Sequence, residues 1–503
     1  MTPDAEALRF GAESLSFAAF RAAAHRLADV LRSEGVGRGE RVAVMVPNGL
    51  DMPIAWFAIA KLRAIVVPVN VTYGERDLAH VLSHSGASVV LSGPEQRPGV
   101  VATSVSIPKV RSVLELTGGE VAVGAGSTGI GGTQRGEAEG PSATANEPVA
   151  IQYTSGTTGF PKGCVLHHGY WIRLARTFRD LAGLDSDDVL LTAQSQTYMD
   201  PTWNLVLSIL VGGPLVVLPR FSASTFWADV GRSGATFFYC IGTMPLFLLA
   251  QPGDEELDRG HRVRLAYCSG IPPLRHEEME RRWGCRWRET YGTTELGVVL
   301  ATGPADEASV GSGSMGRPVP GRDVMVRQGE AYGNEVGELL VRGPDGMLHY
   351  HNDPEATAAR QADDWVRTGD LVTESALGYS LVGRAKDMIR RAGENISAAE
   401  VEAVLVEHPA VRAAARIPVD DDLRGEEVKA YVQRIDDQAI SEAELHAFVA
   451  ERLAPFKVPR YIEFVGAFPL TQSEKIAKAE LKASRPNHTR GSWDVLHLPE
   501  PRP

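Results

Sequence analysis

Residues 153–163, YTSGTTGFPKG, combine residue types that suit phosphate binding. Successive Ser, Thr and Gly residues expose hydroxyls and backbone N–H groups, as a loop that wraps phosphate oxygens requires, and Lys162 adds a positive charge. No GxxxxGK[ST] string aligns here, so this is not a Walker A loop. Taken alone, such a loop is more often a flexible turn. Because it follows the short apolar run EPVAIQ, we expect a phosphate-binding loop after a strand.

A second short motif, YGTTE at residues 291–295, carries groups for a nucleotide and a metal ion. Tyr291 offers an aromatic face for a purine, and Thr294 offers a hydroxyl for phosphate. Glu295 supplies a hard carboxylate oxygen of the kind that Mg²⁺ prefers. The alternative is an exposed strand end without a ligand.

The elements that must position these motifs alternate between helices and apolar strands. Apolar residues recur at helical spacing over residues 16–36, and residues 41–48 then form a buried strand pattern. Two further segments repeat this order, which predicts an α/β fold with large, partly parallel sheets. Residues 117–146 are rich in Gly, Ser, Thr and Ala and are expected to form a flexible connection. After about residue 383, charged helices and short strands predict a small α+β domain.

Composition excludes several classes of protein. A net charge of −12 over 503 residues argues against nucleic-acid binding, which needs a basic face. No apolar run reaches the ~20 residues of a membrane span. The N-terminus lacks a secretory signal pattern, so a cytoplasmic location is expected. The four cysteines are spaced too widely for a CxxC pair and are expected to be buried thiols.

The motifs together resemble the adenylate-forming superfamily. After the phosphate loop and YGTTE come GELLVRGP, WVRTGD, GRAKDMIRRAGENISAAEVE and LTQSEKIAKAEL, in the family order. The residue strings GEN and EVEAVL are similar to those of the acyl-CoA ligase branch, near the carnitine and crotonobetaine ligases. This resemblance implies a large N-terminal domain of mixed sheets and helices, residues 1–383, and a small mobile C-terminal domain, residues 384–503. The small domain would rotate about a hinge near Lys386.

The resemblance also implies the reaction, its cofactors and its site residues. An acyl-CoA ligase converts a carboxylic acid through an acyl-adenylate to an acyl-CoA thioester with release of AMP, using ATP, Mg²⁺ and coenzyme A. The implied catalytic residues are Lys475, Thr294 and Glu295, with Glu295 also holding Mg²⁺. The implied ATP and AMP contacts are Thr154, Ser155, Gly156, Thr157, Thr158, Lys162, Ser269, Gly270, Ile271, Pro272, Thr290, Tyr291, Gly292, Thr293, Asp370 and Arg384.

Two further groups of residues follow from the same resemblance. The implied coenzyme A contacts are Arg390, Arg391, Gly393 and Glu394. The implied acyl pocket is formed by Tyr198, Met199, Gly242, Thr243 and Val298. Residues 195–197, Ser-Gln-Thr, replace the proline and bulky apolar residues of many relatives, which favours a roomier or more polar pocket.

One departure from the family pattern leaves the activity open. Relatives usually place a glycine before the catalytic lysine, whereas Glu474 precedes Lys475 here. An acid at this position offsets part of the lysine's charge, so a ligase with both steps and a thioesterification-only ligase are both retained. In the second case a separate adenylating enzyme supplies the intermediate. A carrier-protein thiol as acceptor and a nucleotide-binding pseudoenzyme are further alternatives. The sequence does not decide between a monomer and a homodimer, although dimers are common among relatives.

Overall fold

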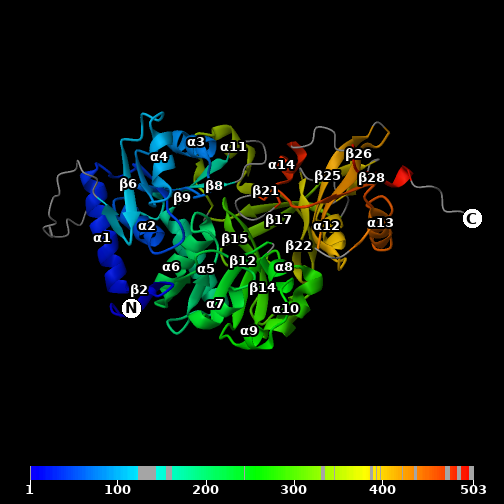
Figure 1. Cartoon of the computed structure of the whole chain (residues 1–503), viewed down its shortest axis with the longest axis horizontal. Coiled ribbons are helices and arrows are strands. Elements are labelled where there is room, and N and C mark those ends of the chain that lie inside the picture. Colours follow the sequence, from blue (N-terminus) through cyan, green and yellow to red (C-terminus); the bar gives the residue numbers. More distant parts are fainter. Residues whose placement is uncertain are drawn as a thin grey trace, which may run out of the picture. The chain divides into compact units, whose positions relative to one another are not determined.

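The chain divides into two compact units, which are described separately (Figure 1). Unit 1 comprises Met1–Ser312, Pro318–Arg322 and Gly343–Ala359, and unit 2 comprises Gly313–Arg317, Asp323–Arg342 and Arg360–Pro503. The computed structural model describes residues 2–122, 143–154, 161–242, 244–329, 335–344, 346–385, 389–391, 394–396, 398–421, 423–435, 439–470, 476–483 and 489–497. The domain boundary between residues 383 and 384 stays a prediction.

The first sheet of unit 1 is mainly parallel and runs in the order β15-β14-β13-β12-β10-β11-β1-β2. Its strands are β1 (Glu6–Phe10), β2 (Glu13–Ser16), β10 (Leu190–Thr192), β11 (Leu215–Val217), β12 (Phe237–Ile241), β13 (Leu265–Ser269), β14 (Arg286–Thr293) and β15 (Gly297–Ala301). The carboxyl ends of β12 and β13 meet at one edge, where Ile241 pairs with Ser269. Loops after parallel strands therefore converge at this edge.

The second sheet of unit 1 runs in the order β19-β9-β8-β4-β3-β5-β6-β7. Its strands are β3 (Arg41–Met45), β4 (Ile65–Pro68), β5 (Val89–Ser92), β6 (Ser112–Thr117), β7 (Glu120–Ala122), β8 (Pro148–Thr154), β9 (Lys162–His167) and β19 (His349–Tyr350). The helices of unit 1 are α1 (Phe17–Ser33), α2 (Asp51–Lys61), α3 (Glu75–Ser85), α4 (Arg97–Ser104), α5 (His168–Ala182), α6 (Met199–Val211), α7 (Phe226–Ser233), α8 (Met244–Leu249), α9 (Glu255–Arg259), α10 (His276–Trp283) and α11 (Pro354–Ala359).

Unit 2 contains two sheets and three α-helices among its described residues. The first sheet joins β17 (Asp323–Gln328), β18 (Gly337–Arg342), β20 (Gln361–Ala362), β21 (Trp365–Ser375) and β22 (Gly378–Arg384). The second joins β23 (Ile389–Arg391), β24 (Glu394–Ile396), β25 (Val411–Asp421), β26 (Gly425–Arg434), β27 (Tyr461–Val465) and β28 (Trp493–Asp494). The helices are α12 (Ala398–Val406), α13 (Glu442–Ala450) and α14 (Lys478–Ala483).

The α/β fold class predicted from the sequence is confirmed, with large mixed sheets in the N-terminal part and a smaller sheet-containing C-terminal part. The helix expected at residues 16–36 is α1, and the strand that follows is β3. The four cysteines are buried and free, as expected. Across the described ranges, no helix has the length and apolar character needed to cross a bilayer.

Aromatic packing fixes α5 against the first sheet of unit 1. The rings of Phe178 on α5 and Trp203 on α6 stack with centroids 4.2 Å apart. Tyr239 and Tyr267 then meet the Phe178 ring edge-on, with centroids at 6.0 and 5.6 Å. Such pairs bury large apolar surfaces in defined geometries, so the position of α5 relative to β12 and β13 is tightly specified.

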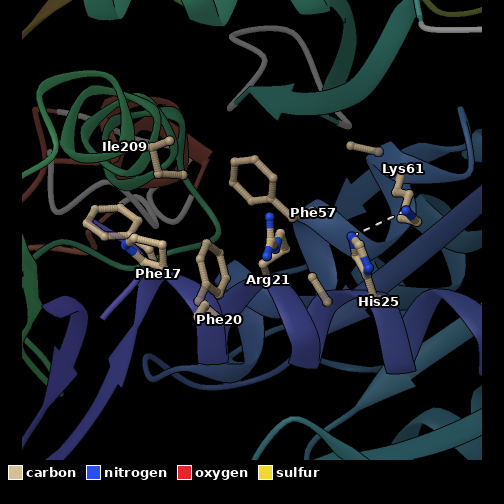
Figure 2. Close-up of a pocket in the computed structure, with 11 residues that line it drawn as sticks. Phe17, Phe20, Arg21, His25, Phe57, Lys61 and Ile209 are labelled. Atoms are coloured by element: carbon tan, nitrogen blue, oxygen red, sulfur yellow. Dashed lines mark hydrogen bonds between the residues drawn. The ribbon is translucent and has the colours of Figure 1, made fainter. Parts of the chain in front are cut away.

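A cavity of about 500 Å³ lies among α1, α2 and α6 (Figure 2). Phe17, Phe20 and Phe57 give it an apolar lining, and the Nζ of Lys61 lies 3.2 Å from Nε2 of His25. None of the predicted site residues lines this cavity. The candidate active-site residues therefore lie away from this cavity.

Candidate active site

The predicted phosphate loop connects two antiparallel strands of unit 1. Thr154 ends β8, Lys162 begins β9, and these two residues pair across the hairpin. The hydroxyl of Thr154 donates to the carbonyl oxygen of Lys162 at 3.5 Å. The ends of the loop thus lie side by side, while residues 155–160 between them lie outside the described residues.

Two histidines on α3 contact the two ends of this loop, and His351, the residue after β19, contacts α3. Nδ1 of His84 lies 2.8 Å from the hydroxyl of Tyr153, and Nε2 of His80 lies 3.4 Å from the carbonyl oxygen of Pro161. Nε2 of His351 lies 3.1 Å from the carbonyl oxygen of His84. No short motif links these three residues, so sequence reasoning missed them.

Acid is expected to destabilise unit 1 through these histidines. Burial lowers the pKa of both His84 and His351 from the ordinary 6.5. Below that value the unfolded chain binds protons that the folded chain does not, so the free energy of unfolding falls as the pH drops. Urea unfolding between about pH 7.5 and about pH 5.5 measures this slope. His84→Gln should reduce it, and an unchanged slope would contradict the assignment.

A tyrosine joins the end of the phosphate loop to the predicted metal ligand. The hydroxyl of Tyr350 donates to Oε1 of Glu295 at 2.6 Å, and Glu295 is 8% exposed. Nζ of Lys162 lies 5.3 Å from the centroid of the Tyr350 ring and 3.6 Å from Oδ2 of Asp353. The pairing of Tyr350 with Cys164 on β9 creates this cluster of Lys162, Glu295, Tyr350 and Asp353.

Two segments of predicted ATP and AMP contacts, residues 269–272 and 290–293, lie where β13 and β14 are adjacent. The hydroxyl of Ser269 donates to the carbonyl oxygen of Thr290 at 2.9 Å. The amide of Gly242 donates to the carbonyl oxygen of Ser269 at 2.8 Å, which brings the predicted acyl pocket beside this segment. Gly270 has φ +102°, a conformation that side chains other than glycine rarely adopt.

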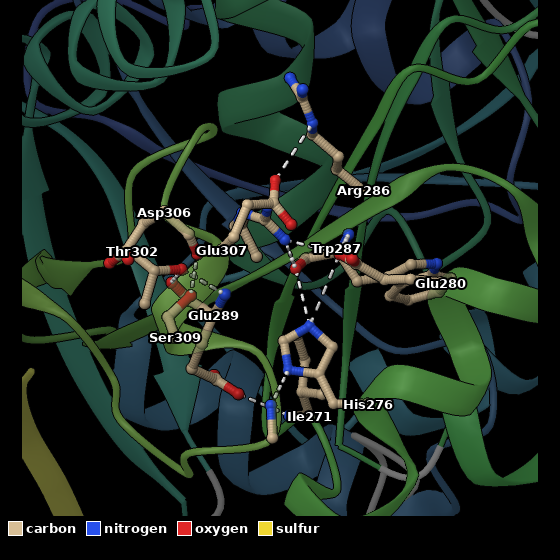
Figure 3. Close-up of polar contacts among 12 residues, drawn as sticks. Ile271, His276, Glu280, Arg286, Trp287, Glu289, Thr302, Asp306, Glu307 and Ser309 are labelled. Atoms are coloured by element: carbon tan, nitrogen blue, oxygen red, sulfur yellow. Dashed lines mark hydrogen bonds and ion pairs between the residues drawn. The ribbon is translucent and has the colours of Figure 1, made fainter.

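Glu289 holds the turn after β13, and sequence reasoning missed this role (Figure 3). Its carboxylate accepts hydrogen bonds from the amides of Gly270 at 2.8 Å and Ile271 at 2.6 Å. Burial raises the pKa of Glu289 to about 8, while these backbone donors act in the opposite direction. The carboxylate thus fixes the backbone of Gly270 and Ile271, which are predicted to contact ATP and AMP.

Glu289→Gln is expected to raise the KM for ATP about 5- to 50-fold, with a smaller effect on kcat. Above about pH 8.5 the glutamate is ionised and both of its oxygens accept, whereas glutamine faces one amide with its own NH₂ group. Steady-state kinetics at that pH measure the effect. Glu255→Gln on α9 is the matched exposed control, and an unchanged KM would remove Glu289 from the positioning of this turn.

A buried network supports the start of β14 (Figure 3). Arg288 has no exposed surface, and its Nη1 and Nη2 donate to Glu280 at 2.5 Å and Glu307 at 2.9 Å. Nε2 of His276 lies 2.9 Å from the carbonyl oxygen of Trp287, and the amide of Gly311 donates to Nδ1 at 3.2 Å. Burial lowers the pKa of His276, which suits this neutral, two-sided arrangement.

The YGTTE motif spans the turn between β14 and β15. Tyr291 is buried, and Thr293 pairs with Gly297 across the two strands. A Cβ on Gly292 would lie 2.4 Å from the carbonyl oxygen of Gly297, so only glycine permits this close approach. The motif therefore presents Thr294 and Glu295 at the strand end, as the sequence favours.

Four of the predicted acyl-pocket residues lie in the described part of unit 1. The side-chain Nδ2 of Asn70 donates to the hydroxyl of Tyr198 at 3.4 Å. The hydroxyl of Tyr170 lies 3.9 Å from Sδ of Met199. Val298 lines a cavity beside α5. Residues 195–197 are expected to give the pocket a polar lining. One of these polar groups already has a partner, because Oε1 of Gln196 accepts a hydrogen bond from the backbone amide of Gly49 at 2.8 Å.

Unit 2 brings two of the predicted ATP and AMP contacts, Asp370 and Arg384, together. Asp370 and Arg384 pair across β21 and β22, and Nε of Arg384 lies 3.0 Å from Oδ1 of Asp370. Asp370 is 3% exposed, and its amide donates to the hydroxyl of Thr368 at 3.0 Å. This pairing within one sheet fixes the orientation of the carboxylate.

The predicted coenzyme A contact Arg391 is engaged inside unit 2. Its Nε lies 2.7 Å from Oε2 of Glu427, and its Nη1 donates to the carbonyl oxygen of Phe456 at 2.8 Å. These bonds favour a structural role for its guanidinium, and its contact with coenzyme A stays a prediction. Arg390 and Glu394 lie on β23 and β24, which pair. The predicted residues outside the described ranges are Ser155, Gly156, Thr157, Thr158, Thr243, Lys386, Gly393 and Lys475.

Comparison with known families decides the identity of the fold. Residues 1–351 match the AMP-binding enzyme family, and residues 400–475 match the AMP-binding enzyme C-terminal domain. This chain belongs to the AMP-binding enzyme family. The resemblance to the adenylate-forming superfamily, acyl-CoA ligase branch, is confirmed.

Similar curated proteins are ligases of coenzyme A. The sulfoacetate–CoA ligase of Cupriavidus necator is 30% identical, with 93% of this chain and 92% of that protein covered. The feruloyl-CoA synthase of an Amycolatopsis species is 33% identical, with 96% of both chains covered. The crotonobetaine/carnitine–CoA ligase of Salmonella paratyphi B is 29% identical, with 93% of both chains covered.

Similar solved structures extend this agreement to the fold. ATP-bound MatB from Rhodopseudomonas palustris has a TM-score of 0.84 at 26% identity, with 96% of both chains covered. The o-succinylbenzoate CoA synthetase of Bacillus subtilis, in complex with its acyl-adenylate intermediate, has a TM-score of 0.83 at 26% identity and the same coverage. This AMP-binding enzyme is an acid–thiol ligase that converts a carboxylic acid through an acyl-adenylate to an acyl-CoA thioester.

Proposed function

We propose that this ligase catalyses both half-reactions itself: attack of the carboxylate on the α-phosphorus of ATP, then attack of the coenzyme A thiol on the acyl carbon. The observation that supports this proposal most strongly is the hydrogen bond from Tyr350 to Glu295, beside Lys162. It places a cation from the phosphate loop and a carboxylate from YGTTE in one cluster, as adenylation requires. The protein supplies position and charge to the reaction.

Mg²⁺ fits the carboxylate of Glu295. Mg²⁺ is commonly bound by one or two carboxylates together with substrate phosphates and water, rather than by a protein cage. Bound Mg²⁺ would neutralise charge on the phosphates, while Tyr350 orients the carboxylate and Lys162 adds a positive charge at the loop.

The remaining roles are distributed over the two units. We assign Asp370 to the ribose hydroxyls, because a buried carboxylate held by a neighbouring arginine can accept two hydrogen bonds. We assign the turn at residues 269–272 to the adenine, and Tyr198, Met199, Gly242, Thr243 and Val298 to the acyl group. Coenzyme A contacts remain assigned to Arg390, Arg391, Gly393 and Glu394. Rotation of residues 384–503 about a hinge near Lys386 would exchange the catalytic faces. We also propose a cytoplasmic location and a homodimer.

Paired assays test this proposal. Pyrophosphate release from ATP is measured with a panel of carboxylic acids, and acyl-CoA formation is measured from the matching synthetic acyl-adenylates. The proposal expects product in both assays. A protein that converts only the adenylates is the thioesterification-only ligase, which the acid beside Lys475 favours. A protein that reacts in neither assay but binds adenylates would be a pseudoenzyme.

A further inference from the structure

A cavity of about 380 Å³ lies in unit 1 between α5 and the segments at residues 297–298 and 319–322. Tyr170, Arg173 and Arg176 line it from α5, and Arg322 lines it from the opposite side. Leu174 and Val319, among others, give the remaining surface an apolar character. The lining of the cavity thus combines apolar side chains with three guanidinium groups.

The cavity lies next to the turn that carries the YGTTE motif. Gly297 and Val298 line it, and they follow Glu295 by two and three residues. The hydroxyl of Tyr170 donates to the carbonyl oxygen of Thr294 at 3.0 Å. A Cβ on Gly297 would lie 3.5 Å from the Tyr170 ring, so the ring covers this turn. Val298 thus belongs both to the wall of this cavity and to the predicted acyl pocket, which places the cavity beside that pocket.

The charge of this cavity differs from that of the chain. The whole protein carries a net charge of −12, yet three arginines and one acid, Asp180, line the cavity. Nε of Arg179 donates to the carboxylate of Asp180 at 2.7 Å, which compensates that negative charge. Arg322 is 9% exposed and donates to the carbonyl oxygen of Leu296, so one cation is held within the wall.

We propose that the substrate acid is dianionic, with the reacting carboxylate at one end and a second anionic group, a carboxylate or sulfonate, that faces Arg173 and Arg176. The inference rests on the proposed function and names the class of its substrate. Arginine binds carboxylates and sulfonates through charge-assisted hydrogen bonds, while Val298 and Leu174 cover the connecting carbons. The same arginines repel a cationic tail and give a neutral tail no partner.

Matched acids measure this preference directly. The pairs are succinate and butanoate, adipate and hexanoate, and terephthalate and 4-methylbenzoate, each compared by kcat/KM for acyl-CoA formation. At least one pair should favour the dianion about tenfold or more, and this ratio should shrink as the salt rises from about 0.02 M to about 0.5 M. A preference for the monoanion in every pair that reacts overturns the proposal.

Variants locate the preference at the cavity. Arg173→Gln combined with Arg176→Gln should lower the dianion ratio roughly 10- to 100-fold, mainly through KM, and leave the monoanionic partners within about threefold. Arg281→Gln, an exposed arginine at the end of α10, is the matched control. Asp180→Asn should shift the ratio in the opposite direction, towards the dianion. Equal ratios in wild type and the double variant would overturn the assignment.

A binding experiment separates this inference from the proposed function. Acyl-sulfamoyl adenosines made from each matched pair of acids mimic the adenylate without needing turnover, and calorimetry gives their affinities. Tighter binding of the tail-anionic member, lost in the double variant, supports the dianionic class even without catalysis. Binding of both members with equal affinity overturns it while the ligase function stands. Failure of both to bind, together with no turnover, rejects the proposed function and with it this inference.

Discussion

Lys475→Ala should lower pyrophosphate release from ATP by about 10²- to 10³-fold, while acyl-CoA formation from a supplied acyl-adenylate stays within about threefold. The lysine is expected to bridge the substrate carboxylate and the α-phosphate, so its charge is needed only while the adenylate forms. The two assays of the proposed function measure both rates on the same preparation. Equal losses in both would show that Lys475 does not belong to the first step alone.

Glu474→Gly is the companion variant, and it tests the departure from the family pattern. A carboxylate within ~6 Å of an ammonium offsets about 1 to 3 kcal/mol of its interaction at an effective dielectric of 20 to 40, and solvent screening reduces this value at a surface. We therefore expect roughly a 3- to 10-fold gain in pyrophosphate release. A wild type near background that gains more than about 100-fold would instead identify a thioesterification-only ligase.

Glu295→Gln should lower pyrophosphate release about 10²- to 10³-fold, because the carboxylate that fits Mg²⁺ is lost. Tyr350→Phe should cause a smaller loss, about 5- to 30-fold, since only the hydrogen bond that orients Glu295 is removed. Titration with Mg²⁺ distinguishes the two roles. The Mg²⁺ concentration for half-maximal activity should rise in both variants, and more in Glu295→Gln.

The control for Tyr350→Phe uses a second tyrosine–glutamate pair. The hydroxyl of Tyr379 donates to Oε1 of Glu374 at 3.2 Å, at an exposed position in unit 2. Tyr379→Phe removes the same chemical group but should leave activity and Mg²⁺ dependence unchanged. If Tyr350→Phe lowered thermal stability without moving the Mg²⁺ dependence, Tyr350 would have a structural role only.

Local patterns of apolar and polar residues in the sequence predicted much of the fold. The helical spacing of apolar residues found α1, and the short apolar run after it found β3. The glycine of YGTTE marks a turn whose backbone requirement is local, because a Cβ on Gly292 would meet the carbonyl oxygen of Gly297, five residues later. Such requirements can be read from neighbouring residues alone, so motif order sufficed to assign the chain to its superfamily.

The tertiary structure alone supplied the residues that support those motifs. Glu295 and Tyr350 are 55 residues apart, and only the pairing of β19 with β9 brings Tyr350 beside the phosphate loop. Glu289 reaches Gly270 and Ile271 because β13 and β14 are adjacent. These are single side chains without a motif or a periodic pattern, since their role arises from contacts between distant strands. The sequence by itself determined the elements and the chemistry of the family, whereas strand order decided which side chains meet, because nonlocal pairing leaves no local pattern.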